Sequence, residues 1–295
     1  MVFVTQVGGV VQTAVASTAA SARDTGVVVA SVAAAAIAWL IFMLPHSVVT
    51  VSVATAYFTR MSHHAASNDM AKFKIDMTTG LKVIALVSMI STAMLIVLSY
   101  PIARVFAGEY PATAALGNVV AAFMIGLVPF SFVYMMQRAF FALEDTKTPF
   151  FFTSIQIAIH ITGSLILGAT MDKQWLVVSI ALLTAFSVSI QGIIAYLALK
   201  SRIGGLEGFG VGRSLITFFL AMIPSAIVGV LVLNWLGGIG EGSYPVDRVV
   251  TALASGFAVG FAMLFTYLGL LWLFKVPELR EVSKQLTIRF GRNSK

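Results

Sequence analysis

The chain has 295 residues, of which 59% are hydrophobic and only 11% charged, and its mean hydropathy is +0.95. A water-soluble domain of this length could not bury so much apolar surface. The absence of cysteine excludes disulfide frameworks, thiolate nucleophiles and cysteine-based zinc sites. The net charge of +7 comes from basic residues scattered between apolar runs, so we expect anionic membrane lipids as partners and no nucleic acid.

Eight apolar runs follow one another along the chain. A bilayer-spanning helix needs about 20 mostly apolar residues, and in lipid only a helix or a closed barrel satisfies its own backbone groups. The first run lacks the charged start of a signal peptide and therefore counts as a span. The sequence predicts an all-α, polytopic transmembrane bundle with about eight spans, at residues 2–20, 27–58, 81–100, 113–136, 148–170, 174–199, 215–236 and 249–274.

Three prolines lie inside these runs, namely Pro45, Pro129 and Pro224. Proline removes a backbone donor and clashes with the preceding helical turn, so each is predicted to kink its helix. Hydrogen-bond donors on neighbouring helices can satisfy the freed carbonyls at such a place.

The basic residues alternate between the connections. Of the 19 Lys and Arg residues, 15 follow the second, fourth, sixth and eighth runs, and four occupy the other connections. By the positive-inside rule this distribution predicts a multi-pass protein of the cytoplasmic membrane with both termini in the cytoplasm. If one run were a buried or re-entrant helix, the alternation would break; the first run, with Gly8 and Gly9, is the main candidate for that alternative.

A glycine-rich connection separates the sixth run from the seventh. It predicts a six-helix bundle at residues 1–203, a two-helix pair at 204–275 and a cytoplasmic tail at 276–295. Residues 63–76 form a polar, helix-compatible stretch that contains Met70, Phe73 and Ile75, which indicates a short interfacial helix, with a solvated loop as the alternative.

No acidic residue falls in the middle of a predicted span. All twelve lie in predicted loops or at helix ends, which argues against a self-contained ion-coupled transporter and against a carboxylate-based intramembrane protease. His63 and His64 are adjacent in a connection, whereas His46 and His160 belong to separate spans. These positions predict no metal site. We expect no catalytic residue, no enzyme activity and no cofactor.

Five polar residues inside or beside the spans are candidates for a substrate cavity: His46, Gln137, Arg138, Gln156 and His160. Gln156 and His160 are four residues apart on one helical face, where they either line a cavity or make hydrogen bonds between helices. Arg138 either extends to lipid phosphates or reaches inward to an anionic substrate.

A P-x-S-x-V pattern occurs twice, starting at Pro45 and at Pro129, 84 residues apart. Internal repeats with broken helices are common in secondary transporters, so the repeat favours transport.

Two longer motifs carry a family resemblance. The motifs are LPHSVVTVSVATAYFTRMS at residues 44–62 and QRAFFALEDTKTP at residues 137–149. Both resemble the MurJ family, also called MviN, and their amino-acid sequences resemble those of actinobacterial members. That family flips lipid II and belongs to the multidrug/oligosaccharidyl-lipid/polysaccharide exporter superfamily. Its members have fourteen helices in two six-helix lobes plus a final pair, and this chain resembles helices seven to fourteen.

The resemblance implies alternating access around a cationic cavity that takes the pyrophosphate and sugars of lipid II. It also implies that the last two helices form a groove for the polyprenyl tail, that both termini are cytoplasmic, and that an N-terminal lobe is missing from this chain. Similar proteins carry an Asp-Arg pair where this chain has Trp39 and Leu40, so part of the cavity charge is absent.

The sequence leaves open whether the chain is a fragment, a split half or a diverged protein. It also leaves two alternative functions, a flippase for another polyprenyl-linked glycan and a non-transporting membrane scaffold for cell-wall synthesis.

Overall fold

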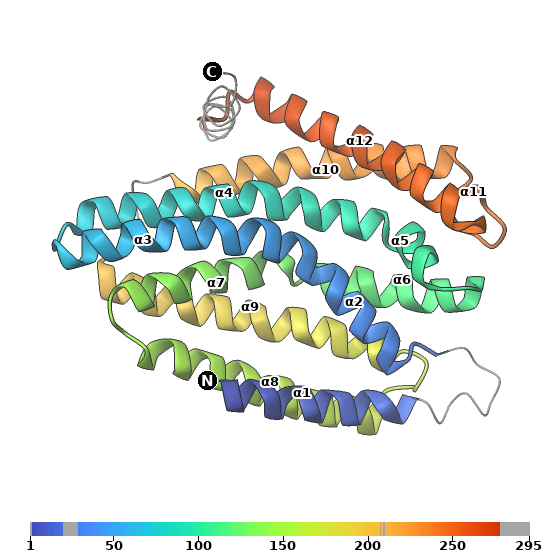
Figure 1. Ribbon diagram of the computed structural model, residues 1–295, viewed down its shortest axis with the longest axis horizontal. Helices are drawn as coiled ribbons and strands as arrows, with labels where there is room; N and C mark the ends of the chain where they lie inside the picture. The colour runs from blue at the N-terminus through green and yellow to red at the C-terminus, as the bar shows by residue number, and fades with distance from the viewer. Residues whose placement is uncertain (1, 20–28, 207, 209, 278–295) are drawn as a thin grey trace, which may run out of the picture.

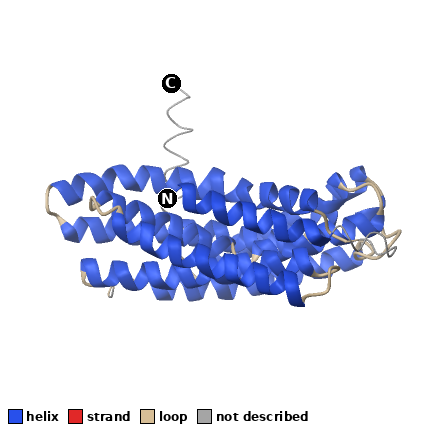
Figure 2. Ribbon diagram, turned by 90° about the horizontal axis from the view of Figure 1, so that it is seen from below, coloured by secondary structure: helices blue, strands red, loops and turns tan. Residues whose placement is uncertain are grey.

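The structure is a computed structural model that describes residues 2–19, 29–206, 208 and 210–277. Throughout this part of the chain the regular elements are helices, and no strand occurs (Figure 2). The predicted tail lies almost entirely outside the described residues. The elements are α1 Val2–Ser17, α2 Val32–Pro45, the π-helical turn η2 His46–Val51, α3 Ser52–Ala66, α4 Met70–Val97, α5 Ser99–Phe106, α6 Tyr110–Met124, α7 Leu127–Ala142, α8 Lys147–Thr170, α9 Leu176–Ile203, α10 Val211–Trp235, α11 Tyr244–Asp247 and α12 Val249–Leu273.

Helix lengths confirm the predicted transmembrane bundle. Among the described residues, six helices are long and apolar enough to cross a bilayer: Val32–Ala66, Met70–Val97, Lys147–Thr170, Leu176–Ile203, Val211–Trp235 and Val249–Leu273. A seventh is formed by α6 and α7 if this pair, bent by 42°, counts as one span. The first predicted run is α1, whose 16 residues are fewer than the roughly 20 that a straight span needs.

The long helices lie side by side along the longest axis of the molecule (Figure 1). The connections from α3 to α4, from α7 to α8 and from α9 to α10 lie at one end, and α1 begins and α12 ends toward it. The connections from α5 to α6, from α8 to α9 and from α10 to α12 lie at the opposite end. The connections after the second, fourth and sixth predicted runs, which are rich in Lys and Arg, therefore lie at one end of the bundle. The three connections that are poor in basic residues lie at the opposite end.

The second predicted run is a continuous 35-residue helical segment whose hydrogen bonding changes at Pro45. Proline cannot donate a backbone hydrogen bond, and its ring crowds the carbonyl four residues earlier. Wider π-type winding begins directly after it, at His46, and lasts until Val51. Such π-bulges are often found at functional sites.

The other two prolines are accommodated differently. The break between α6 and α7 falls at Ile125 and Gly126, and Pro129 occupies the first turn of α7, where a missing N–H removes no intrahelical bond. A Cβ on Gly126 would stand 3.1 Å from the Cα of Ala185, so glycine lets α9 approach the break. Helix α10 continues through Pro224 as one helix.

The expectation of a short interfacial helix or loop at residues 63–76 is wrong. Helix α3 extends to Ala66, and α4 already begins at Met70, where the carboxylate of Asp69 accepts from the backbone N–H of Lys72 at 3.1 Å. This cap, together with the helix-forming residues that follow, lets two long helices meet in a tight hairpin.

The same hairpin corrects the placement of one acid and one histidine. Asp76 lies inside α4 rather than in a loop and is only 2% exposed. Its carboxylate pairs with Arg60 at 2.5 Å and stands 3.3 Å from His64 Nε2, so His64 is not in a solvated loop. Burial is possible because a guanidinium compensates the carboxylate, which sequence spacing alone did not indicate.

Helices α10 and α12 lie together beside α4 (Figure 1). A shared apolar core joins them to α4, with Phe218 from α10, Met263 from α12 and Ala85 from α4 all fully buried. Tyr267 donates its hydroxyl to the carbonyl of Leu86 at 2.9 Å, which ties α12 to α4. The last pair is thus attached to the rest of the bundle through α4 and its neighbour α5.

Candidate functional site: a polar strip and an apolar groove

The polar strip begins where the π-helical turn meets α7. Ser131 is fully buried, and its hydroxyl accepts from Thr50 Oγ1 at 3.0 Å. His46 Nδ1 lies 3.4 Å from the same oxygen. Because His46 and Thr50 both belong to η2, the altered winding after Pro45 directs two polar side chains toward one residue of α7. Ser131 therefore joins the two segments that carry the P-x-S-x-V repeat.

Arg138 continues this strip along α7. It donates from Nη2 to the hydroxyl of Tyr134, one turn earlier, at 2.5 Å. Its guanidinium carbon is 4.8 Å from the Tyr134 ring centroid and 5.8 Å from that of Phe58 on α3. Cation–π contacts and this hydrogen bond hold the charge beside aromatic faces in a half-buried position. We call Ser131, Tyr134 and Arg138, with His46 and Thr50 opposite, the polar strip.

The two positions that the resemblance assigns to an Asp-Arg pair are Trp39 and Leu40 here, and Trp39 belongs to an aromatic cluster. Trp39 stacks on Phe42 with ring centroids 5.1 Å apart and contacts Phe130 edge-on at 6.0 Å. Phe130 in turn packs against the ring of His46 at 4.6 Å. An aromatic cluster thus borders the polar strip where charge was expected.

Gln156 and His160 do not belong to the polar strip. Gln156 Nε2 donates to Ser187 Oγ of α9 at 3.2 Å, and His160 Nε2 lies 3.2 Å from Gln12 Oε1 of α1. These contacts match the hydrogen-bonding alternative, because each side chain joins two helices. The structure therefore divides the five candidates: His46 and Arg138 lie in the strip, half-buried Gln137 lies beside Arg138 on α7, and the other two join helices elsewhere.

The sequence did not single out Thr50, Tyr134 or Phe58. A usable signal was present for Tyr134, because residues 131, 134 and 138 follow the spacing of three and four that places side chains on one helical face. Phe58 and Thr50 come from another span, and their positions depend on the π-helical turn, which sequence did not specify.

The turn between α7 and α8 belongs to the second family motif. The carboxylate of Asp145 accepts from the backbone N–H groups of Lys147 and Thr148, each at 3.0 Å, and from the Thr148 hydroxyl at 2.7 Å. These bonds, led by the backbone bond from Thr148, lower the pKa of Asp145 below its usual value. The ionised carboxylate thereby satisfies donors at the start of α8 and fixes the helix that follows Arg138.

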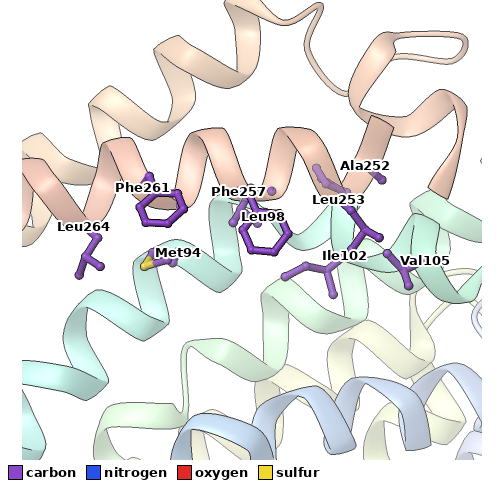
Figure 3. A pocket seen from close by; sticks show the side chains of 12 residues that line it. Met94, Leu98, Ile102, Val105, Ala252, Leu253, Phe257, Phe261 and Leu264 are labelled. Atoms are coloured by element: carbon purple, nitrogen blue, oxygen red, sulfur yellow. The ribbon is translucent and has the colours of Figure 1, made fainter. Parts of the chain in front are cut away.

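An apolar groove of about 380 Å³ lies between α12 on one side and α4 and α5 on the other (Figure 3). Its walls are entirely apolar side chains, including Phe257 and Phe261 from α12 and Leu98 and Ile102 opposite (Figure 3). Neither a charged side chain nor a group of potential metal ligands is found there among the described residues. The groove suits a hydrocarbon chain rather than a headgroup.

Small residues of α12 make room for this groove. Ala252, Gly256 and Gly260 recur every four residues along one face of the helix. A Cβ added to Gly260 would meet Met94 at 3.3 Å, but one added to Gly256 would meet nothing within 4 Å. Gly256 therefore does not serve close helix packing, and its missing side chain leaves space open.

Taken together, the fold and the site define a polytopic α-helical membrane protein with a basic polar strip and a separate apolar groove. The family model for the lipid II flippase MurJ matches residues 1–246, and the chain belongs to this family. That match ends just before α12, which begins at Val249.

Similar proteins carry the same description. The chain is 25% identical to a probable lipid II flippase MurJ of Borreliella burgdorferi, over 63% of this chain and 35% of the relative. It is 31% identical to lipid II flippase MurJ of Thermosipho africanus, over 54% and 31% of the two chains. A solved structure of lipid II flippase MurJ in an inward closed conformation has a TM-score of 0.57 and 20% identity, covering 79% of this chain and 46% of that one.

The solved structure confirms the predicted fold. The chain itself spans less than half the length of these relatives, namely 35% of the Borreliella burgdorferi protein and 43% of a related protein of Rhizobium tropici.

Proposed function

We propose that this chain forms the C-terminal part of a flippase that moves lipid II across the cytoplasmic membrane by alternating access. One observation carries the proposal. The same helical bundle contains a guanidinium held in a polar strip and, on other helices, an entirely apolar groove. A lipid-linked glycan has the same two parts. Its charged head needs a shielded polar path, whereas its tail is soluble in hydrocarbon.

Arg138 is the residue we assign to the pyrophosphate. Guanidinium groups form bidentate hydrogen bonds to phosphate, and contact with Tyr134 and Phe58 orients the group in advance. The alternative, in which Arg138 extends to bulk lipid phosphates, does not need the bond to Tyr134. Anionic lipids would then occupy the same basic end of the bundle.

The groove between α12 and α4–α5 is assigned to the polyprenyl tail. Its lining is apolar throughout, and Gly256 leaves room beside Phe257 for a chain of carbon atoms. Because lipid tails outside the groove are equally apolar, a chain in the groove is stabilised by van der Waals packing against these side chains rather than by removal from water.

Both termini are placed in the cytoplasm in this proposal. The arrangement of connections at two ends agrees with the split of basic residues, with the α3–α4 and α7–α8 connections at the basic, cytoplasmic end. Because the chain has no cysteine, single cysteines at Ser67 and Gly240 can be labelled with a membrane-impermeant maleimide in intact cells. Labelling at Gly240 but not at Ser67 is expected.

An N-terminal lobe is the partner required by the proposal, since the relatives are more than twice as long as the matched segments. The division into residues 1–203, a pair at 204–275 and a tail at 276–295 is kept as part of this proposal. The decisive experiment supplies the chain together with a matching lobe in cells depleted of their own MurJ. Rescue of growth and exposure of lipid II on the outer face are expected; failure of both contradicts the transport assignment.

One observation favours a different substrate. Trp39, which takes one of the two positions where similar proteins place an Asp-Arg pair, belongs to an aromatic cluster with Phe42 and Phe130. A flippase for another polyprenyl-linked glycan would keep the groove but recognise other sugars at this cluster. Binding of lipid II and of a different polyprenyl-linked glycan to the purified protein separates the two. Co-purification of cell-wall enzymes without binding of either lipid would instead indicate a scaffold.

A further inference from the structure

Arg104 ties together two connections at the end of the bundle opposite the α3–α4 hairpin. It lies in the last turn of α5, and its Nε and Nη2 both donate to the carbonyl of Asp247, at 3.2 and 2.7 Å. Its Nη1 donates to the carbonyl of Ala107 at 2.7 Å and also to that of Gly108. Arg104 and Asp247 are 143 residues apart in the chain, so one side chain joins two segments that are distant in sequence.

The carbonyls that Arg104 binds follow the ends of two helices. Ala107 caps the C-terminus of α5, and Asp247 is the last residue of α11, two residues before α12 begins at Val249. The last carbonyls of a helix lack intrahelical partners and carry partial negative charge, so a guanidinium at this place is favourable. A second tie lies nearby, where the hydroxyl of Tyr110 donates to the carbonyl of Ile239 at 3.0 Å.

The hydrogen bonds from Arg104 to the carbonyls of Ala107 and Asp247, which we call the clasp, lie beside the apolar groove. Val105, the residue after Arg104, lines the groove from α5, and Ala252 and Leu253, five and six residues after Asp247, line it from α12 (Figure 3). The two groove walls are thus joined by hydrogen bonds at one end. At the other end, around Leu264, the wall of α12 faces Met94 of α4 (Figure 3).

We infer that Arg104 is a positioning residue that fixes the distance between α5 and α12 and closes this end of the groove. An apolar chain in the groove then ends near Leu253 and extends toward Leu264. That the chain is polyprenyl rests on the proposed function, whereas the role of Arg104 in spacing the two helices does not.

The spacing can be measured directly, because the absence of native cysteine allows a unique pair of spin labels. Phe106 at the end of α5 and Val250 at the start of α12 are 56% and 76% exposed and lie outside the groove lining. In the full protein, a narrow distance distribution between these labels is expected. Arg104→Gln should broaden this distribution and shift it to longer distances, because the hydrogen bonds that join α5 to the backbone before α12 are lost.

Arg248→Gln is the matched control. Arg248 is at the same end and pairs with the carboxylate of Asp247 at 3.4 Å, but its side chain is 81% exposed and this pair does not reach α5. It should leave the distance distribution unchanged. If Arg104→Gln also leaves it unchanged, the clasp is refuted. Should that variant fail to fold, Tyr110→Phe decides the matter, since loss of the second tie predicts a smaller shift in the same direction and no shift refutes the clasp.

A second measurement tests the groove separately. A photoreactive phenylalanine analogue at Phe257 should crosslink undecaprenyl phosphate, and Arg104→Gln should lower the yield several-fold while Arg248→Gln does not. An absent crosslink in the otherwise unchanged protein would contradict the proposed occupant, but the label distances would still decide the role of Arg104. An unchanged yield together with a changed distance would show that Arg104 spaces the helices without positioning the chain, which overturns that part of the inference.

Discussion

The polar strip and the apolar groove are built in opposite ways. In the strip, a few polar side chains from η2 and α7 are fixed by specific bonds, such as Thr50 to Ser131 and Arg138 to Tyr134. In the groove, the decisive feature is missing volume, as at Gly256, where an added Cβ would touch nothing. Removing one atom should therefore damage the strip, whereas adding atoms should damage the groove.

The largest effect is expected at Arg138. Arg138→Gln removes the charge from the strip but keeps a polar side chain, so transport should fall about a hundredfold, equivalent to about 3 kcal/mol of lost headgroup interaction. Arg138→Lys should recover only part of this loss, because an ammonium cannot bind phosphate in a bidentate manner. Exposure of lipid II on the outer face of cells is the measurement.

Arg213→Gln provides the control for Arg138. Arg213 is exposed in the first turn of α10, near the same end of the bundle, and should not contact a headgroup in the strip. An equal loss of transport in both variants would show that overall positive charge, rather than the strip, is responsible.

The groove is tested by filling it. Gly256→Leu adds a side chain into open space, so the folded bundle should keep its stability while the groove loses volume. Transport is expected to fall about tenfold, equivalent to about 1.4 kcal/mol, since a tail displaced from the groove loses its packing contacts with the groove walls. The measurement combines the transport assay with crosslinking of a polyprenyl probe.

Gly269→Leu is a matched control on the same helix. A Cβ at Gly269 also meets nothing within 4 Å, but this residue does not line the groove. Transport by this variant should stay normal. If it falls as far as in Gly256→Leu, the cause is a bulkier α12 and not an occupied groove.

The sequence predicted the apolar parts of this molecule better than its polar contacts. Run lengths and hydropathy identified the spans because bilayer crossing imposes them on composition. The placement of His160 within a span was correct, but its partner Gln12 comes from α1, 148 residues away, and no periodicity contains that information. Asp76 was misplaced for a related reason, because its burial depends on Arg60 across the α3–α4 hairpin.

Helix breaks show the same limit. Proline marks where a helix can break, but it does not determine what happens there. Pro45 is followed by π-helical winding, and the bend near Pro129 falls at Gly126. Helix α10 continues through Pro224. Each result depends on what packs beside the proline. At Gly126 the backbone of Ala185 approaches closely, which decides the position of the bend.

A smaller effect is expected from Ser131→Ala. The substitution leaves His46 and Thr50 facing a methyl group in a buried place, which should lower the free energy of unfolding by about 1–2 kcal/mol. Denaturation in mixed detergent measures this change. Ser164→Ala is the control, because Ser164 is also fully buried but its hydroxyl has no hydrogen-bond partner within the described part of the chain. If both variants lose the same stability, the bonds of Ser131 do not hold the strip together.

The smallest effect concerns the turn that leads from the strip into α8. Hydrogen bonds lower the pKa of Asp145 in the folded protein, so its ionised form stabilises the fold. This contribution is complete above the unfolded pKa of about 4 and is lost as the pH falls through the lower folded pKa. Asp145→Ala should cost about 1 kcal/mol at neutral pH, the usual value of a helix cap. Asp145→Asn keeps an acceptor without a titrating group, so it should lose less at neutral pH and remove this part of the acid sensitivity. Unfolding measured from pH 7 to pH 3 tests both variants; an acid-induced loss as large in Asp145→Asn as in the unchanged protein would assign the sensitivity to other carboxylates.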